Sequence, residues 1–238
     1  MTTTDDQELL REYASRSSEP AFATLVSRHV DMVYSVALRC VGNHHQAEEI
    51  TQAVFVVLAR KAGSLRRGTV LSGWLFHTAR LTTANFIRTE TRRARREQEA
   101  FMQSHVEENQ TEVWQQIAPL LDDAIADLGE KDRNAVVLRF VKGKDYTEVG
   151  EVLGASQEAA QVRVSRAVEK LRKIFSKRGV VLSVAALGGA ISANSIEAAP
   201  VGLAVSATAM AVQSTALTAS TLTLAKGTLK FMAWTKLN

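Results

Sequence analysis

The chain has 238 residues, 46% of them hydrophobic and 23% charged, with a formal net charge of +4. This length can bury one or two small cores, and the low content of proline and aromatic residues, with abundant Ala, Leu, Val, Glu and Arg, favours helices over strands. The single cysteine, Cys40, excludes an internal disulfide framework and a multi-cysteine zinc site.

Three helices are predicted in the first hundred residues. Apolar side chains recur at spacings of three and four from 21 to 41, and again from 46 to 61, as expected of amphipathic helices. The glycine-containing segment 62–72 is predicted to be a loop. The third helix, 73–96, begins with apolar and aromatic side chains and ends in a cluster of arginines. Like charges at helical spacing repel each other, so this cluster indicates a negatively charged partner.

A second helical unit is predicted from about residue 118. The acidic stretch 97–117 before it is compatible with a helix or an extended linker, and we favour a linker whose C-terminal part joins the next helix. The helices of the second unit are separated by glycine-containing turns. They cover 118–128, 130–143, 145–154 and 156–179.

The last two of these helices have the pattern of a helix-turn-helix. Gly154 stands where a helix ends in a left-handed residue, and Ser156 is a suitable N-cap for the next helix. Hydrogen-bonding side chains near the start of that helix and cations further along are typical of a recognition helix in the major groove of DNA. An ordinary surface helix in a helical hairpin is the alternative.

The formal charge alternates strongly along the chain. It is −4 for residues 1–58, +9 for 59–96, −9 for 97–130, +6 for 131–178 and +2 for 179–238. Two basic blocks separated by an acidic one indicate a polyanionic partner that is contacted at two places.

Three segments in this order resemble a known family. They are "AEEITQAVFVVLARKAGSL" (47–65), "GWLFHTARLTTANFIRTETRRARRE" (73–97) and "LGEKDRNAVVLRFVKGKDYTEVGEVLGASQEAAQVRVSRAVEKLRK" (128–173). Together they resemble bacterial RNA polymerase sigma factors of the sigma-70 family, extracytoplasmic-function (ECF) type. The resemblance covers roughly residues 18–178 and implies a non-enzymatic factor that binds core polymerase and recognises and melts promoter DNA.

The resemblance also implies roles for individual residues. The polymerase-binding positions are Glu48, Glu49 and Gln52. The positions expected at the −10 region of the promoter are Arg66, Arg67, Arg80, Asn85, Arg88, Arg92 and Arg93. Those expected at the −35 region are Ser156, Gln157, Glu158, Gln161, Arg163 and Arg166. Trp74 is assigned to the core rather than to base stacking.

The sequence therefore predicts an all-α protein of two small helical domains, joined by an acidic linker and followed by a tail rich in Ala, Ser and Thr. The N-terminal domain should hold three to four helices and the C-terminal one the helix-turn-helix. The expected boundaries are 1–17 for an N-terminal arm, 18–98 for a sigma region 2-like domain, 99–117 for the linker, 118–178 for a sigma region 4-like domain and 179–238 for the tail.

The tail and the N-terminus bear on location. The N-terminus is polar and acidic, without a secretory signal, so a cytoplasmic protein is expected. Residues 198–225 carry no charge, but Gly, Ser, Thr and Pro200 dilute the apolar signal that a spanning helix needs. We expect a flexible or partner-bound tail, with a membrane-spanning helix as the alternative. Weak membrane association through the basic, aromatic end 226–238 stays open.

Other function classes have less support. The five histidines form no metal-ligand set with Cys40, and neither a phosphate-binding glycine loop nor a nucleophile elbow occurs, so we expect no enzyme activity, metal or cofactor. A stand-alone helix-turn-helix regulator is the main alternative, but it leaves the basic block at 88–96 unexplained. Beyond core polymerase and promoter DNA, an anti-sigma factor stays open as a further partner.

Overall fold

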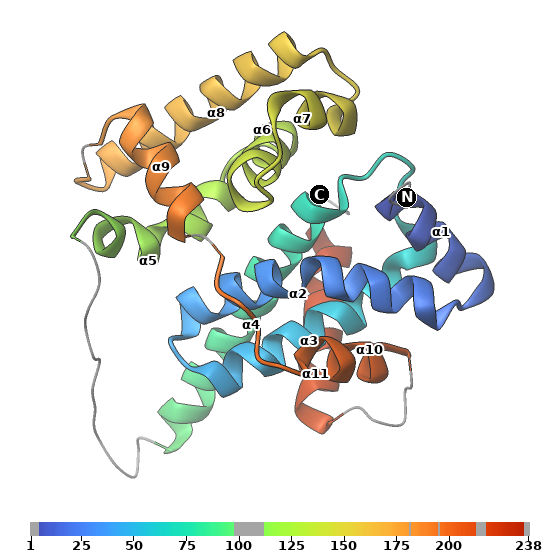
Figure 1. The fold of residues 1–238 in the computed structure, drawn as a ribbon. Coiled ribbons are helices and arrows are strands. Elements are labelled where there is room, and N and C mark those ends of the chain that lie inside the picture. The colour runs from blue at the N-terminus through green and yellow to red at the C-terminus, as the bar shows by residue number, and fades with distance from the viewer. Residues whose placement is uncertain (1–4, 98–111, 181, 195, 213–217, 236–238) are drawn as a thin grey trace.

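The computed structural model describes residues 5–97, 112–180, 182–194, 196–212 and 218–235 (Figure 1). Every regular element in these ranges is helical, in agreement with the predicted all-α class. The elements of the first part are α1 (Asp6–Arg16), α2 (Glu19–Val41), α3 (His44–Lys61), the 3-10 helix η1 (Ala62–Ser64) and α4 (Leu71–Glu97). Those of the second part are α5 (Glu112–Ala126), α6 (Glu130–Val136), the π-helix η2 (Val137–Val141), α7 (Tyr146–Leu153), α8 (Gln157–Lys177), α9 (Val184–Asn194), α10 (Leu203–Val212) and α11 (Ala219–Thr235).

The three predicted helices of the N-terminal domain are confirmed as α2, α3 and α4. The Ser18 hydroxyl accepts a hydrogen bond from the Ala21 amide at the start of α2, and Asn43 caps α3 in the same way. Between them Gly42 takes a left-handed φ of 62°, which ends α2. Phe76 of α4 is fully buried and Trp74 is partly buried against the core, as the assignment of Trp74 to the core requires.

Both flanks of this domain contain a further helix. The expected N-terminal arm contains α1, whose Leu9 and Leu10 are buried against α2. Helix α5 begins at Glu112, so the C-terminal part of the acidic stretch joins the next helix as expected, and Trp114 and Ile117 enter the core with helical spacing. The rest of the linker, 98–111, lies outside the described residues.

The helix-turn-helix is confirmed as α7 and α8. Asp145 and Glu148 form a capping box at the start of α7, and Gly154 ends it with a φ of 64°. Gly150 faces the turn so closely that a Cβ there would lie 2.7 Å from the Ala155 carbonyl oxygen. The turn between the two helices therefore requires glycine at this position.

The two domains pack against each other through α2 and α4 on one side and α5, α6 and η2 on the other (Figure 1). Arg39 of α2 donates two hydrogen bonds to the Asp122 carboxylate of α5, at 2.8 and 2.9 Å. Lys142 donates to the Arg28 carbonyl oxygen at 2.6 Å. The described domains thus adopt a closed arrangement.

The described part of the tail is helical and folded against the same chain, which differs from the expectation of a flexible or partner-bound tail. Helix α9 packs on α8 and η2, while α10 and α11 pack on the N-terminal domain, beside α3 (Figure 1). Small side chains allow this close packing, and buried threonines donate to carbonyl oxygens one turn back, as Thr228 does to Leu224. In the described part of the chain no helix has the length and apolar character needed to span a membrane.

Candidate nucleic-acid and polymerase interfaces

The start of α8 presents a polar, solvent-facing surface. The Ser156 hydroxyl accepts a hydrogen bond from the Ala159 amide at 3.2 Å, so the cap fixes the direction of the first turn. The inner stripe of α8, represented by Val164 and Leu171, is buried. The predicted −35 residues with exposed side chains are Ser156, Gln157, Glu158, Gln161 and Arg166.

Arg163, the remaining predicted −35 residue, lies differently. Its Nη1 is 3.4 Å from Asp132 Oδ1, and its side chain is 40% exposed. Lys170 Nζ contacts the other carboxylate oxygen of Asp132 at 2.5 Å. This pair of contacts joins α8 to α6, so Arg163 has a place in the domain structure as well as a partly exposed guanidinium.

Three of the predicted −10 residues, Arg66, Arg67 and Arg88, have exposed side chains. Arg66 and Arg67 are exposed in the loop after η1, and Arg88 is exposed on α4, where its Nη2 donates to Asn85 Oδ1 at 3.0 Å. Arg92 and Arg93 lie in the last turns of α4, and only their helical backbone is described.

Arg80, another predicted −10 residue on α4, is covered by helix α5 of the C-terminal domain. Its side chain is only 14% exposed, it forms an ion pair with Asp123 of α5, and its Nη1 donates to Cys40 Sγ at 2.6 Å. Burial and the nearby Asp122 carboxylate raise the pKa of the Cys40 thiol to about 11, so the sulfur is protonated at neutral pH. In the closed arrangement Arg80 is therefore a domain-interface residue.

The three predicted polymerase-binding residues lie together in the first turns of α3, and each is half-buried. Glu49 accepts a hydrogen bond from the Ser220 hydroxyl of α11, and Gln52 Nε2 donates to Ser206 Oγ of α10 at 3.2 Å. Burial raises the pKa of the Glu49 carboxyl. Two of the three residues are thus in direct contact with the tail.

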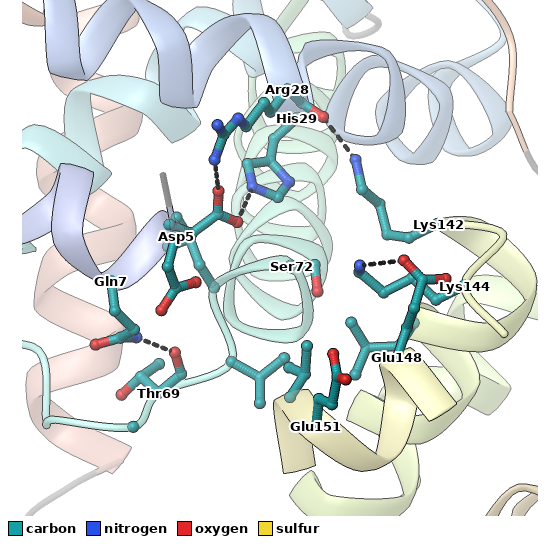
Figure 2. A pocket seen from close by; sticks show the side chains of 16 residues that line it. Asp5, Gln7, Arg28, His29, Thr69, Ser72, Lys142, Lys144, Glu148 and Glu151 are labelled. Carbon is teal, nitrogen blue, oxygen red and sulfur yellow. Dashed lines mark hydrogen bonds and ion pairs between the residues drawn. The ribbon is translucent and has the colours of Figure 1, made fainter. Parts of the chain in front are cut away.

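A cavity of about 690 Å³ lies between the two domains (Figure 2). Asp6 accepts hydrogen bonds from Arg28 Nη1 at 2.8 Å and His29 Nε2 at 2.7 Å. Burial raises the pKa of Asp6, but these hydrogen bonds outweigh it and lower the pKa to about 2. Burial lowers the pKa of His29, and the hydrogen bond and charge of Asp6 oppose this effect. Across the cavity, Lys144 pairs with Glu148 at 3.1 Å.

The sequence did not identify the contacts of Asp6 and Lys142, because their partners lie 22 to 114 positions away and follow no local period. The acidic and basic groups of the cavity largely pair with one another. No group of three or more His, Cys, Asp or Glu side chains suited to a metal ion occurs within the described ranges.

Comparison with known proteins identifies both domains. The family profile described as Sigma-70 region 2 matches residues 25–93, and that described as Sigma-70, region 4 matches residues 124–173. The tail lies beyond both matches.

Three curated relatives cover the same part of the chain. RNA polymerase sigma factor CarQ of Myxococcus xanthus is 31% identical over 169 residues, which are 67% of this chain and 92% of CarQ. ECF RNA polymerase sigma factor SigE of Mycolicibacterium smegmatis is also 31% identical over 169 residues, covering 68% of this chain but 64% of SigE. ECF RNA polymerase sigma factor SigW of Bacillus subtilis is 26% identical over 175 residues, covering 66% and 90%. The chain thus spans just under two thirds of SigE and nearly all of CarQ and SigW.

Proposed function

This chain belongs to the sigma-70 family of RNA polymerase sigma factors, in the extracytoplasmic-function class, and from this premise we propose how its parts divide the work of initiation. The start of α3 binds core polymerase, the loop 62–72 with α4 holds the opened −10 region, and α8 reads the −35 region. The chain performs no chemistry of its own. It acts in the cytoplasm, where core polymerase meets chromosomal DNA.

The observation that carries the −35 assignment is the exposed polar face at the start of α8. Gln157 and Gln161 are exposed there and Arg166 is exposed further along, on a helix whose opposite stripe is buried. Side chains of these types form hydrogen bonds with base edges in the major groove, where each base pair has its own pattern of donors and acceptors. A helix-turn-helix places the first turns of its second helix in that groove.

The −10 assignment is supported by the second basic surface, on the other domain. Opening a promoter requires bases to leave the stack and cations to hold the strand backbone. Arg66, Arg67 and Arg88 present exposed guanidinium groups on the loop and on α4. A regulator that binds only duplex DNA has no need of this surface.

The closed arrangement adds one requirement. Because Arg80 is ion-paired with Asp123, it can reach DNA only after α5 has moved away from α4. We therefore assign Arg80 to DNA contact in an open arrangement, with the domains separated on polymerase. An anti-sigma factor would be a partner that favours the closed arrangement.

Run-off transcription with core RNA polymerase on a genomic promoter library tests this function. The sigma factor should support transcription from a defined set of promoters, and core enzyme alone should not. A stand-alone regulator would instead bind duplex operator DNA without polymerase and add no new start sites. That outcome would replace the proposal by its alternative.

A further inference from the structure

Helix α3 is buried on more sides than a three-helix core explains. Ala53 to Leu58 are all buried, without the polar stripe of a surface helix. Residues such as Val54 and Phe55 belong to the main core, whereas Val56 and Val57 form a separate apolar cluster with Ala225 and Met232 of α11. A helix that is apolar all round needs a second partner, and here the tail provides it.

Side-chain packing in α11 shows that this contact is specific. Its buried residues recur at helical spacing and form one stripe toward α3 and α4. These are Thr221, Leu224, Ala225, Thr228 and Met232. The Thr228 hydroxyl lies 3.2 Å from that of Thr82 on α4. At Gly227 a side chain would collide with the amide of Asn85. The tail thus covers a predicted −10 residue as well as α3.

The connector between α9 and α10 is also held in place. The Glu197 amide donates to Ser35 Oγ at 2.7 Å, and Ser35 Oγ in turn lies 3.0 Å from the Glu197 carbonyl oxygen. The Ala199 amide donates to Asp31 Oδ1 at 2.9 Å. These bonds fix residues 196–202 across α2, so that α10 arrives beside the start of α3 (Figure 1).

The character of the contact suits a cover that can be removed. Helix α10 carries no charged residue, and the two lysines of α11, Lys226 and Lys230, are exposed. The contact therefore depends on small apolar surfaces and on a few hydrogen bonds, one of which joins the Ser220 hydroxyl to the Glu49 carboxylate. No buried ion pair of the described tail has to be broken to release it.

We propose that α10 and α11 are a built-in cover that competes with core polymerase for the start of α3 and with promoter DNA for the middle of α4. This inference rests on the proposed roles of Glu49, Gln52 and Asn85. In the free protein the cover lowers the affinity for core polymerase, and binding of polymerase displaces it. The cover lies outside the two segments that match the family profiles, so it is an addition to the shared sigma domains.

A pair of alanine-to-arginine variants of the full chain tests the cover. Ala225 is fully buried against Val56 and Val57, and Ala225→Arg should push α11 away from α3. Ala233→Arg, at an exposed position of the same helix, is the matched control. We expect Ala225→Arg to bind core polymerase about tenfold more tightly than the parent chain, because the competent state no longer has to expel the tail. Ala233→Arg should stay within about twofold.

Hydrogen exchange on the unaltered chain provides a second measurement that depends on no variant. Amides of α10 and α11 should be protected in the free protein and lose protection when core polymerase is saturating. Protection that persists or increases in the complex would overturn the proposed cover. Unchanged core affinity of a folded Ala225→Arg chain would overturn it as well.

A third variant separates this inference from the function on which it rests. Glu48→Arg reverses a charge on the proposed polymerase-binding face. If it leaves core affinity unchanged, the assigned polymerase-binding face is wrong, and the tail then covers no polymerase-binding site. If it weakens core binding, and if the exchange of α10 and α11 in the unaltered chain does not change when core polymerase is saturating, the polymerase face stands and only the cover is wrong.

Discussion

Arg39 of α2 and Asp122 of α5 form a buried, two-fold hydrogen-bonded ion pair across the domain interface. Arg39 Nε lies 2.9 Å from Asp122 Oδ2, and Nη2 lies 2.8 Å from Oδ1. Their side chains are only 12% and 3% exposed. The adjacent Asp123 pairs with Arg80, so one turn of the acidic helix α5 neutralises two arginines of the N-terminal domain. Part of the alternating charge in the sequence is thus satisfied within the chain.

Asp122→Ala should destabilise the protein by about 3–5 kcal/mol, because a buried guanidinium loses the carboxylate that offsets its desolvation. Urea unfolding followed by circular dichroism measures the change. Asp127→Ala is the matched control: Asp127 is 62% exposed and 3.6 Å from Arg178, so its loss should cost no more than about 1 kcal/mol. Equal effects of the two substitutions would contradict the role given to the buried pair.

His77 gives the domain interface a predictable response to acid. Burial, and to a smaller extent the charge of Arg133 on α6, lowers the pKa of His77 to about 4. Below about pH 6.5 the unfolded chain therefore binds a proton that the native chain does not, and stability falls until the pH reaches about 4. At about 1.4 kcal/mol for each pKa unit, a fall of the pKa from 6.5 to about 4 corresponds to roughly 3.5 kcal/mol, and solvent screening of the partly exposed ring reduces the expected loss to roughly 2–3 kcal/mol.

His77→Gln should remove this part of the acid destabilisation. Unfolding free energies measured between pH 4 and 6.5 would depend less steeply on pH in the variant than in the parent chain. His45→Gln, at an exposed histidine, should keep the parent slope. A His77→Gln profile parallel to that of the parent would show that the acid response comes from other groups.

The sequence predicted local structure well, because its signals are local. The glycine at 154 and the cap at Ser156 define the helix-turn-helix within a few residues, and the period of three to four located α2, α3 and α4. The tail escaped prediction for a physical reason. Its threonines and serines look polar in sequence, yet Thr208 and Thr228 satisfy their hydroxyls on carbonyl oxygens one turn back and pack as small apolar groups.

The candidate site was predicted in part. Exposure of Gln157, Gln161 and Arg166 is compatible with the pattern on α8, because one buried stripe determines the opposite face. The pairing of Arg80 with Asp123 could not be predicted, because it joins residues 43 positions apart in two separate domains. No periodicity within either helix carries that information. The DNA-contact roles themselves remain predictions.

Arg166→Ala should weaken recognition of the −35 region. Loss of one base contact costs about 1–3 kcal/mol, so promoter affinity of the holoenzyme should fall by roughly 5- to 150-fold. Lys177→Ala, at the exposed last residue of the same helix, also removes one positive charge but farther from the predicted reading residues, and should have a smaller effect. Promoter binding by holoenzyme and run-off transcription measure both variants. Unchanged output from a cognate promoter would remove Arg166 from the reading face.

Replacing Arg92 and Arg93 together with Ala tests the basic end of α4. The double variant should bind core polymerase as the parent chain does, because these residues lie in the last turns of α4, on a different helix from the proposed polymerase-binding turn of α3. It should form fewer open complexes, because two cations that hold the separated strand are gone. Permanganate reactivity of unpaired thymines measures opening, and pull-down with core polymerase measures assembly.

The contrary outcome is a double variant that no longer binds core polymerase in the pull-down, while the few complexes that do form open DNA normally. That outcome would assign these arginines to polymerase rather than to DNA. The cluster of like charges at 88–96 would then be explained by a protein surface, and the opening of DNA would depend on the loop arginines Arg66 and Arg67.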